Sequence, residues 1–427
     1  MSKKKKVALV PRLRFPEFCS DGEWQTCSLG DISDRITEKV GEKQLITLSI
    51  SAGIGFVSQA EKFSRDISGK QYENYIQLKK GDFSYNKGNS KKYPQGCIYE
   101  LKEYDDAAVP NAFISFRLRD GYVSNFYKGY FDNNFHGRQL TKFITSGARS
   151  DGLLNINSSD FLSIILPTPK GKDEQQKIAD CLSSLDDLIN AEDKKLGFLK
   201  AHKKGLLQKL FPAEGETVPE IRFNGYNGVW VRRKFSDDIN LVGGATPFKQ
   251  NSDYWGGNIV WLSSQEIKDK YVTSATYTVT QKAVDDNTTK VIKNGTPLIV
   301  TRSGVLANRF PISIPTVDVA INQDIKALIY DTDKINTDFF VAQLQSFEGY
   351  ILKSIVKSGT TVQSVNVSDL LKLDLAYPSK EEQTAIGNLF CTIDELITAQ
   401  ADKIETLKAH KKGLMQGLFP SIEEANE

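Results

Sequence analysis

Apolar residues recur at alternating steps of four and three along two stretches of the chain. The two series are Ile178, Leu182, Leu185, Ile189, Leu196, Leu199, Leu206 and Leu210, and then Ile386, Phe390, Ile393, Ile397, Ile404, Leu407, Leu414 and Leu418. This heptad spacing predicts two coiled-coil helices of about 37 residues, or about 55 Å each. Polar residues fill the two open positions of each seam: Glu192 and Lys203, and Gln400 and Lys411. Because a polar residue there fixes helix register at some cost in stability, we expect these four to set the alignment of the helices.

The ends of both helices carry stop and start signals. Pro212 and Pro420 cannot continue a helix and predict where each one ends. Ser379 and Glu382 predict a capping box at the start of the second helix, whereas Gly171 holds the equivalent position in the first.

The two helical segments are copies of one sequence. LKAHKKGLLQKLFP (199–212) and LKAHKKGLMQGLFP (407–420) agree at twelve of fourteen positions and lie 208 residues apart, which is 407 minus 199. The same offset relates Arg14 to Arg222 near the start of each half. The middles diverge, as GDFSYNKGNSKKYPQG and GTPLIVTRSGVLANRFP illustrate. The chain is therefore predicted to be a tandem duplication in the order domain, helix, domain, helix.

The predicted fold class is α+β, with two mixed α/β domains separated by two long antiparallel coiled-coil helices and pseudo-two-fold symmetry from the duplication. We expect the domains at 1–169 and 213–379, the helices at 170–212 and 380–420, and a disordered tail at 421–427. Two equal helices that each follow a domain can pack side by side and set the distance between the domains.

Composition fits an ordinary soluble protein that is too long for one compact domain, with 427 residues, 40% hydrophobic and 25% charged. The net charge of +2 excludes a DNA binder that works by bulk charge alone, but it allows local basic clefts. In the opening MSKKKKVALVPRLRF, Pro11, Arg12 and Arg14 interrupt a short apolar patch, so neither a signal peptide nor a membrane span is expected. We expect a cytoplasmic protein.

Cysteine and histidine usage argues against a metal site. The five cysteines include no C-x-x-C pair, and only three histidines are present, so neither a structural zinc nor a disulfide framework is expected. His202 and His410 lie beside lysines on the helix flank, where contact with solvent or a partner is favoured over metal binding.

Catalytic motifs are scarce. The sequence contains no phosphate loop, dinucleotide-binding fingerprint, nucleophile elbow or H-E-x-x-H, and it lacks the Pro-Pro of an adenine methyltransferase motif. Asp82 with Glu100 and Lys102 could hold magnesium in a nuclease, and Glu266 with Lys268 is a second loose match. Such pairs arise by chance in a lysine-rich chain, so a solvated strand end is the favoured interpretation.

The divergent middles are rich in residue types that contact nucleic acid. Cations reach phosphates, and arginine, lysine, asparagine and glutamine can hydrogen-bond to base edges. In the first domain the candidate DNA-contacting residues are Tyr85, Asn86, Lys87, Asn89, Ser90, Lys91, Lys92 and Arg149. In the second they are Thr246, Lys249, Gln250, Tyr254, Trp261, Ser264, Arg302, Ser303 and Arg309. For each single residue an ordinary polar turn is the competing interpretation.

Several strings resemble the specificity subunit of Type I restriction–modification enzymes. They are LRFPEF, GGATPFKQNSDYWGGNIVWLSSQEI (243–267), IVTRSG, AINQDIKAL (320–328) and the EQ-x-x-I helices that end in KKGLLQKLFP or KKGLMQGLFP. The resemblance runs over nearly the whole chain. The first domain departs from the family's G-x-TP and YWGG pattern and looks like another type of its recognition domains.

The resemblance implies two target recognition domains that each read one half of a split double-stranded DNA sequence, with the helices setting the gap. It also implies two docked methyltransferase subunits that carry S-adenosylmethionine, and restriction subunits that use ATP and Mg²⁺, so that this chain is not itself an enzyme. The residues expected to form the spacer and dock partners are Leu199, His202, Lys203, Leu206, Leu407, His410, Lys411 and Leu414.

Other functions remain open at this stage. Within the family, a Type II arrangement with a fused methyltransferase–nuclease partner is an alternative. Outside it, the alternatives are a stand-alone DNA-binding regulator, a structural coiled-coil scaffold and a self-sufficient nuclease that uses Asp82.

Overall fold

The computed structural model describes residues 9–88, 93–144, 153–213, 215–357 and 362–420. Its contacts divide the chain into two compact units, Met1–Glu192 with Lys403–Glu427, and Asp193–Asp402. Each unit thus holds one domain and part of both long helices, and the units cut across the four segments expected from the sequence. The expected tail, 421–427, lies outside the described residues.

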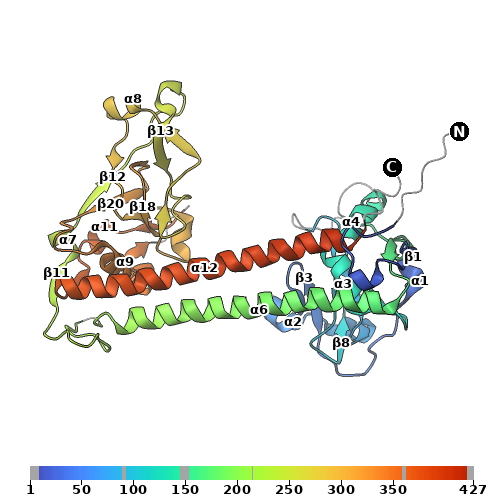
Figure 1. Ribbon diagram of the computed structural model, residues 1–427. Coiled ribbons are helices and arrows are strands. Elements are labelled where there is room, and N and C mark those ends of the chain that lie inside the picture. Colours follow the sequence, from blue (N-terminus) through green and yellow to red (C-terminus); the bar gives the residue numbers. More distant parts are fainter. Residues whose placement is uncertain (1–8, 89–92, 145–152, 214, 358–361, 421–427) are drawn as a thin grey trace. The chain divides into compact units, whose positions relative to one another are not determined.

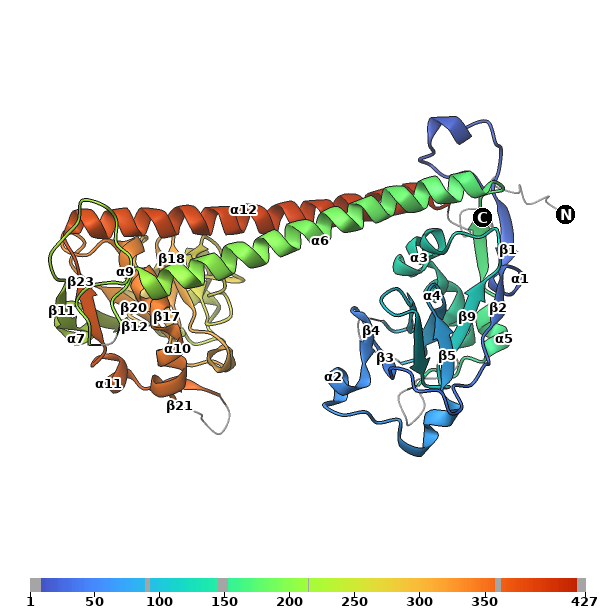
Figure 2. The same cartoon turned by 90° about the horizontal axis from the view of Figure 1, so that it is seen from below.

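The two long helices are α6 (Lys172–Lys209) and α12 (Lys380–Leu418), close to the bounds expected from the heptad pattern. They lie side by side in both views (Figure 1, Figure 2). Within the units, residues further along α6 form ion pairs with residues earlier in α12, so the paired segments run antiparallel. The joining ion pairs are Asp186–Lys411 (2.6 Å), Glu192–Lys403 (2.5 Å) and Lys203–Asp394 (2.6 Å). Three of the four polar seam residues, Glu192, Lys203 and Lys411, therefore form ion pairs between the helices, and Gln400 is buried.

The contacts of one unit recur in the other at the 208-residue offset. The Leu13 amide donates to the Gly417 carbonyl (2.9 Å), and the Ile221 amide donates to the Lys209 carbonyl (3.0 Å). The ring of Phe419 meets Trp24 edge-on at an interplanar angle of 88°, and Phe211 meets Trp230 at the same angle, although these two tryptophans are 206 residues apart. Each domain is therefore closed by an aromatic ring at the C-terminal end of a long helix.

A buried ion pair at the start of each long helix also recurs at the 208-residue offset. Arg14 donates Nε and Nη2 to the Glu174 carboxylate (2.8 Å each), and Arg222 donates the same atoms to Glu382 (2.7 Å each). The predicted capping box is therefore only half formed. Ser379 Oγ accepts the Glu382 amide (3.3 Å), but the Glu382 side chain binds Arg222 instead of turning back to the cap.

The first domain is built from short antiparallel strands and small helices. Its four-stranded sheet has the order β2 (Ser33–Arg35), β9 (Ile114–Leu118), β6 (Phe83–Asn86), β7 (Cys97–Glu100). The two-stranded pairs are β1 (Gln25–Ser28) with β10 (Ile165–Thr168), β3 (Leu48–Ser51) with β4 (Gly55–Ser58), and β5 (Ile76–Lys79) with β8 (Asp106–Val109). The helices are α1 (Leu29–Ile32), α2 (Gln59–Phe63), α3 (Ser124–Asp132), α4 (Phe135–Leu140) and α5 (Ser158–Leu162).

The second domain contains a five-stranded and a four-stranded sheet. One has the order β12 (Asn240–Gly243), β20 (Ile325–Ile329), β17 (Leu298–Val300), β18 (Ile312–Pro315), β14 (Tyr271–Val272), and the other β15 (Tyr277–Val279), β13 (Trp255–Leu262), β19 (Val319–Ile321), β16 (Val291–Ile292). The two-stranded pairs are β11 (Val231–Lys234) with β23 (Asp374–Tyr377) and β21 (Val356–Lys357) with β22 (Ser364–Val365). The helices are α7 (Phe235–Asp238), α8 (Gln281–Asp285), α9 (Thr337–Ser346), α10 (Glu348–Tyr350) and α11 (Val367–Leu370).

Apolar packing joins each domain to the long helices. Ile178 and Leu182 from α6 and Met415 and Leu418 from α12 belong to the core of the first domain. The core of the second contains Leu210 and Phe211 at the end of α6 and Ile386, Phe390 and Ile393 from α12. The predicted α+β class with long antiparallel helices is confirmed. Among the described segments, no helix has the length and apolarity needed to cross a membrane.

Candidate nucleic-acid interface

Four loops of the second domain converge because the strands before them end at the same edge. β12 and β17 both run antiparallel to β20, so their carboxyl ends point the same way, and β13 runs parallel to β19. Hydrogen bonds then link the two sets: the Asn322 amide donates to the Leu262 carbonyl (2.9 Å), and the Thr301 amide donates to the Asp324 carbonyl (2.7 Å). We call the loops Gly244–Gln250, Ser263–Ile267, Thr301–Ser303 and Asn322–Asp324 the strand-end loops.

The first strand-end loop is held firmly at its base. A Cβ atom on Gly244 would lie 1.8 Å from the Ile321 carbonyl oxygen, so only glycine allows this close approach. Thr246 Oγ1 donates to Gln323 Oε1 (2.7 Å). The Ala245 carbonyl accepts both Trp261 Nε1 and Thr289 Oγ1, at 3.2 Å each. The backbone of this loop is therefore fixed before any ligand binds.

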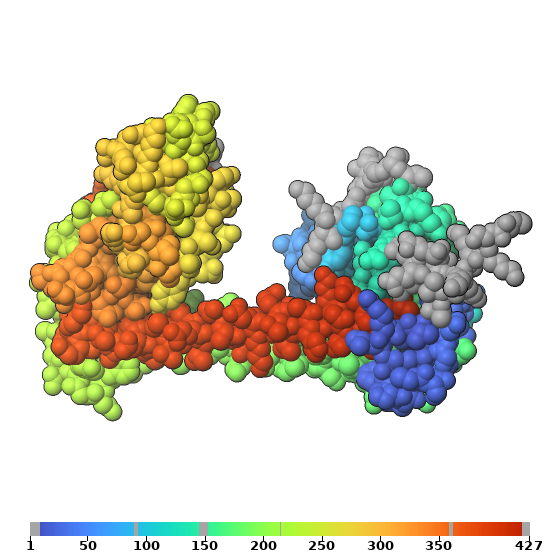
Figure 3. Space-filling view, turned by 45° about the horizontal axis from the view of Figure 1, so that its top comes forward, coloured from blue at the N-terminus to red at the C-terminus, as the bar shows by residue number. Residues whose placement is uncertain are grey.

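The tip of the same loop projects outward. Phe248 is 67% exposed, and Lys249 and Gln250 are exposed beside it. The Phe248 carbonyl accepts Trp255 Nε1 (3.2 Å) and the Asn251 amide (3.1 Å), so the turn that presents these side chains is braced. The segment of residues 245–290, yellow in the space-filling view, lies at the surface of its domain (Figure 3).

The three predicted residues after β17 have different environments. Arg302 is exposed, and its guanidinium has neither a hydrogen bond nor an ion pair within the described residues. Ser303 Oγ caps the following short helix by accepting the Val305 amide (3.4 Å). Arg309 donates to the carbonyls of Lys268 (2.9 Å) and Ile267 (3.3 Å), so it braces the loop after β13. Of the three, Arg302 is the side chain available to a ligand.

Two predicted aromatic contacts are better explained by packing. Trp261 is only 6% exposed and packs with Val279, Ala283 and Ala320, so it supports the loop and does not reach DNA. Tyr254 is half-buried and donates its hydroxyl to Asp286 (3.1 Å), which raises the pKa of Tyr254. Ser264 is also half-buried within a strand-end loop.

In the first domain, the hairpin of β6 and β7 carries the predicted residues, and one of them needs correction. Tyr85 is fully buried, stacks on Phe161 at 4.5 Å and donates its hydroxyl to the Gln95 carbonyl (2.8 Å). A side chain without exposed surface cannot contact DNA, so Tyr85 belongs to the core. Phe83, Ser84 and Tyr85 of β6 are all buried, so this strand is covered on both faces.

The neighbouring residues shape the base of the loop. Asn86 is half-buried, and its Oδ1 accepts the Gly88 amide (2.9 Å). Lys87 is half-buried, and its carbonyl accepts the Leu154 amide (2.9 Å). The remaining candidates of this domain, Asn89, Ser90, Lys91, Lys92 and Arg149, lie outside the described residues.

Sequence reasoning missed three exposed apolar side chains near these loops. They are Phe248, Tyr277 (58% exposed) beside Trp255, and Ile54 (75% exposed) at the tip of the β3–β4 hairpin. The Gly53 amide donates a hydrogen bond to the Tyr99 hydroxyl oxygen (2.7 Å), and this bond braces that hairpin. The signals that could have identified two of them are a phenylalanine between Pro247 and Lys249 and an isoleucine between Gly53 and Gly55, whereas Tyr277 has no such neighbours.

The magnesium site considered for a nuclease does not form. Asp82 is buried and binds Arg117 through Nε (2.6 Å) and Nη2 (2.7 Å), which neutralises its charge. Burial raises the pKa of Glu100, whose nearest cation is Lys102 (3.3 Å). Glu266 accepts the Ser263 amide (2.9 Å) and acts as a cap. Within the described ranges, no group of three or more His, Cys, Asp or Glu side chains could hold a metal ion.

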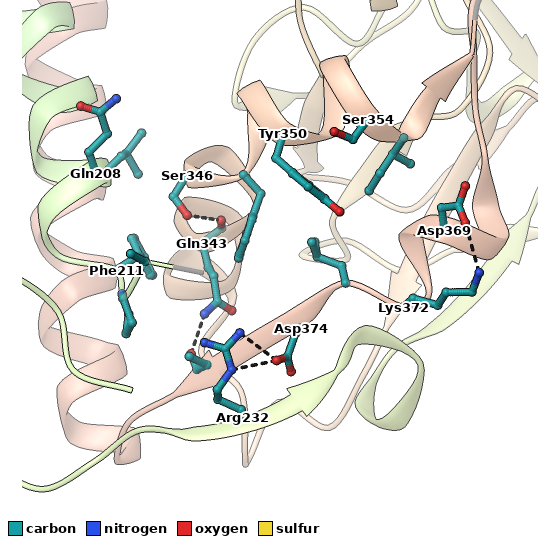
Figure 4. A pocket seen from close by; sticks show the side chains of 17 residues that line it. Gln208, Phe211, Arg232, Gln343, Ser346, Tyr350, Ser354, Asp369, Lys372 and Asp374 are labelled. Atoms are coloured by element: carbon teal, nitrogen blue, oxygen red, sulfur yellow. Dashed lines mark hydrogen bonds and ion pairs between the residues drawn. The ribbon is translucent and has the colours of Figure 1, made fainter. Parts of the chain in front are cut away.

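A cavity of about 460 Å³ in the second unit contains none of the predicted DNA-contacting residues (Figure 4). Phe211, Phe347 and Ile355 supply apolar walls, and the ion pair Arg232–Asp374 (2.7 Å) lies at its edge. Its position beside the end of α6 separates it from the strand-end loops, so it forms no part of the candidate interface.

The sequence matches the family described as Type I restriction modification DNA specificity domain over residues 21–200 and again over 227–409. The chain belongs to this family. Its two matched segments each cover one domain and most of one long helix, which agrees with the repeated contacts of the two units.

Individual relatives are more distant. The Type I restriction enzyme MjaIX specificity subunit of Methanocaldococcus jannaschii is 25% identical over 199 residues, which cover 45% of this chain and 44% of the relative. The EcoR124I/EcoR124II specificity subunit of Escherichia coli is 30% identical over 155 residues, covering 36% and 38%. The chain thus spans less than half the length of these two relatives. The crystal structure of a Type I system S subunit from M. genitalium has the same fold, with a TM-score of 0.55, 15% identity and coverage of 96% of this chain and 99% of that one.

The helix residues of this family member divide into two groups. Lys203 and Lys411 pair with Asp394 and Asp186, and Leu206 and Leu414 pack against the domain cores. Leu199 and Leu407 are half-buried along the seam, whereas His202 and His410 are exposed. The first six therefore contribute to packing and ion pairing inside the units. The two histidines lie at equivalent positions on open faces of the helices.

Proposed function

We propose that this chain is the DNA-recognition subunit of a Type I restriction–modification complex, in which each domain reads one half of a split DNA target. The observation that supports the proposal is a repetition with a difference. The contacts between domain and long helices repeat at one sequence offset, whereas the loops of the two domains differ in sequence. A repeated frame can present two domains to two half-sites of one duplex, and different loops offer different hydrogen-bonding groups to the bases.

The exposed chemistry of the strand-end loops supports this role for the second domain. Arginine can bind guanine O6 and N7 with two hydrogen bonds, and glutamine can bind adenine N6 and N7. Arg302 and Gln250 are exposed, and Lys249 adds a cation suited to a phosphate. Rigid backbone at Gly244 and Thr246 would limit the entropy lost when these side chains bind.

Partner subunits would supply the chemistry. Two methyltransferase subunits would dock because the helices offer the same face twice, with His202 and His410 as its equivalent exposed residues. S-adenosylmethionine, ATP and Mg²⁺ would bind to the partners and not to this chain. Calorimetry of the purified chain should therefore detect no stoichiometric binding of S-adenosylmethionine, and a site with one ligand per chain would contradict this part of the proposal.

A domain exchange tests the reading of half-sites. The chain, produced with its methyltransferase subunits, should direct adenine methylation to one split sequence, which sequencing of modified DNA can map. Replacing residues 230–377 with the second domain of a relative of known specificity should change one half of the sequence and leave the other half intact. A change in both halves, or in neither, would contradict the assignment of one half-site to each domain.

A further inference from the structure

Four charged side chains of the second unit form a continuous row that begins on the long helices and ends in the domain. Lys203 on α6 pairs with Asp394 on α12 (2.6 Å). The other oxygen of Asp394 faces Lys270 of the domain (3.4 Å), and Lys270 also pairs with Asp338 on α9 (2.8 Å). We call these four residues the second ion row.

The first unit contains a row with the same connections. Lys411 on α12 pairs with Asp186 on α6 (2.6 Å), and the other oxygen of Asp186 faces Lys128 on α3 (3.6 Å). Lys128 also pairs with Asp132 on α3 (2.5 Å). These four residues are the first ion row. In both rows a helix aspartate joins a lysine of the other helix to a lysine of the domain.

The domain lysines come from different places in the fold. Lys270 directly precedes β14, whereas Lys128 lies within α3. The helix α3 corresponds to α9, because the amides that precede them, of Val123 and Asn336, donate to Gln175 (3.1 Å) and Gln383 (2.9 Å), which are equivalent at the 208-residue offset. The two domains thus reach the equivalent helix aspartates from non-equivalent positions. The two domains therefore share an ion pair from a helix aspartate to a domain lysine, but the lysine stands at a different position in each domain.

The second ion row is the better shielded of the two, because Lys128 and Asp186 of the first row are 30% and 36% exposed. The side chains of Lys270, Lys203 and Asp394 are 12%, 15% and 19% exposed, so the pairs are less screened than surface ion pairs. Burial lowers the pKa of Lys270, but the hydrogen bond and charge of Asp338 and the charge of Asp394 raise it more strongly. Lys270 is therefore a cation at any physiological pH.

The second ion row also acts on the sheet that carries the strand-end loops. β14 is the edge strand of the sheet that contains β12 and β17, whose following loops present Lys249 and Arg302. The Tyr271 hydroxyl lies 3.7 Å from Cys391 Sγ on α12 and adds a contact at the same place. The apolar core already attaches the domain to the helices, so the ionic contact is a second point of attachment, which limits tilting.

We propose that Asp186 and Asp394 are positioning residues that determine how strictly the complex enforces the length of the gap between its two half-sites. This inference rests on the proposed function. A gap that is one base pair longer displaces a half-site by about 3.4 Å and rotates it by about 34° around the duplex axis. A domain attached at two points resists the tilt needed to follow that displacement, and a domain attached by its apolar core alone follows it more easily.

The test measures gap preference separately from base preference. Wild-type chain and the variants Asp186→Asn, Asp394→Asn and Lys270→Met are each produced with the methyltransferase subunits, and methylated adenines are mapped on a DNA library that contains both half-sites at the native gap and at gaps one base pair shorter or longer. The preference for the native gap should fall about tenfold in the variants, equivalent to about 1.4 kcal/mol, while the bases of both halves stay the same. Asp318→Asn is the matched control, because it breaks the exposed pair Lys293–Asp318 (2.7 Å) of the same domain away from α12.

The outcomes are distinct. If the wild-type complex methylates no split sequence, the proposed function fails. If the wild type does so but all three variants keep its gap preference, or if the variants change the bases of a half-site, the inference about the ion rows is overturned. Should Asp394→Asn fail to fold, Lys270→Met decides the question for the second unit, because it keeps the apolar stem and leaves the Lys203–Asp394 pair in place.

Discussion

Arg302 offers the most direct test of the candidate interface, because it is exposed and lacks a side-chain partner among the described residues. Its backbone forms a bridge with Ser364, which fixes the main chain at this point independently of the side chain. Arg302→Ala should therefore change the free energy of unfolding by no more than about 0.5 kcal/mol, as at other exposed positions.

The effect on DNA binding should be much larger. If the guanidinium donates two hydrogen bonds to a guanine, its loss costs about 1–3 kcal/mol of binding free energy, or about 5- to 150-fold in affinity. The methylated sequence should then relax at one position of one half-site. If the guanidinium instead binds a phosphate, affinity should fall for all sequences alike, and the slope of log affinity against log salt should decrease by about one.

Fluorescence anisotropy of the complex with labelled DNA over a range of salt concentrations separates the two cases, and mapping of methylated adenines identifies the affected position. Arg309→Ala is the control, because Arg309 binds the carbonyls of Ile267 and Lys268 inside the domain and should lower thermal stability. Unchanged affinity, salt slope and methylated sequence in Arg302→Ala would show that this loop does not contact DNA.

Three further predictions concern stability and spacing. Arg222→Met should lower the free energy of unfolding by about 3–5 kcal/mol, because it leaves Glu382 buried without its cation. Arg232→Met, at a more exposed ion pair, should lower it by less than about 1 kcal/mol. Equal losses in thermal unfolding would contradict this prediction. Four residues inserted after Glu192 add about 6 Å and about one turn to α6, so the gap between the methylated half-sites should lengthen by one or two base pairs while the bases of both half-sites stay the same. Two inserted residues rotate the seam by about 200° and should abolish methylation. Burial lowers the pKa of His136 to about 3, below its unfolded value of about 6.5, so the unfolded chain takes up a proton that the folded one excludes, and the stability of the first unit should fall as pH drops from about 6.5 towards 3. His136→Phe should flatten that pH dependence in urea titrations, and an unaltered slope would count against it.

Some site residues followed from residue type, and others did not. Lys249, Gln250 and Arg302 were predicted from side-chain chemistry and are exposed on strand-end loops. Tyr85 and Trp261 were predicted from the same chemistry but are buried. An aromatic residue near a polar loop suits both a core and a DNA contact, and only the packing of surrounding elements decides between them: Ser84 and Leu262, the strand neighbours of Tyr85 and Trp261, are buried as well.

The ion pairs show a similar division. Lys203 and Lys411 occupy seam positions in the heptad pattern, so their role in helix pairing was predictable. The pairing of Glu382 with Arg222 was not, because a glutamate three residues after a serine is equally typical of a capping box. Arg222 lies 160 residues away in the chain, and folding alone brings it to that carboxylate.

Features that depend on local periodicity and repetition could be predicted from the sequence alone: the two long helices, their polar register positions, the tandem duplication and the family. These follow because a heptad seam and a copied segment can be recognised without knowing which other residues lie nearby. The three-dimensional fold was needed to learn which loops share an edge, which candidate side chains are exposed and which charges connect the helices to the domains. Strand pairing and core packing join residues far apart in the chain, so Thr246 meets Gln323 and Lys270 meets Asp394 through contacts that neither neighbourhood encodes alone.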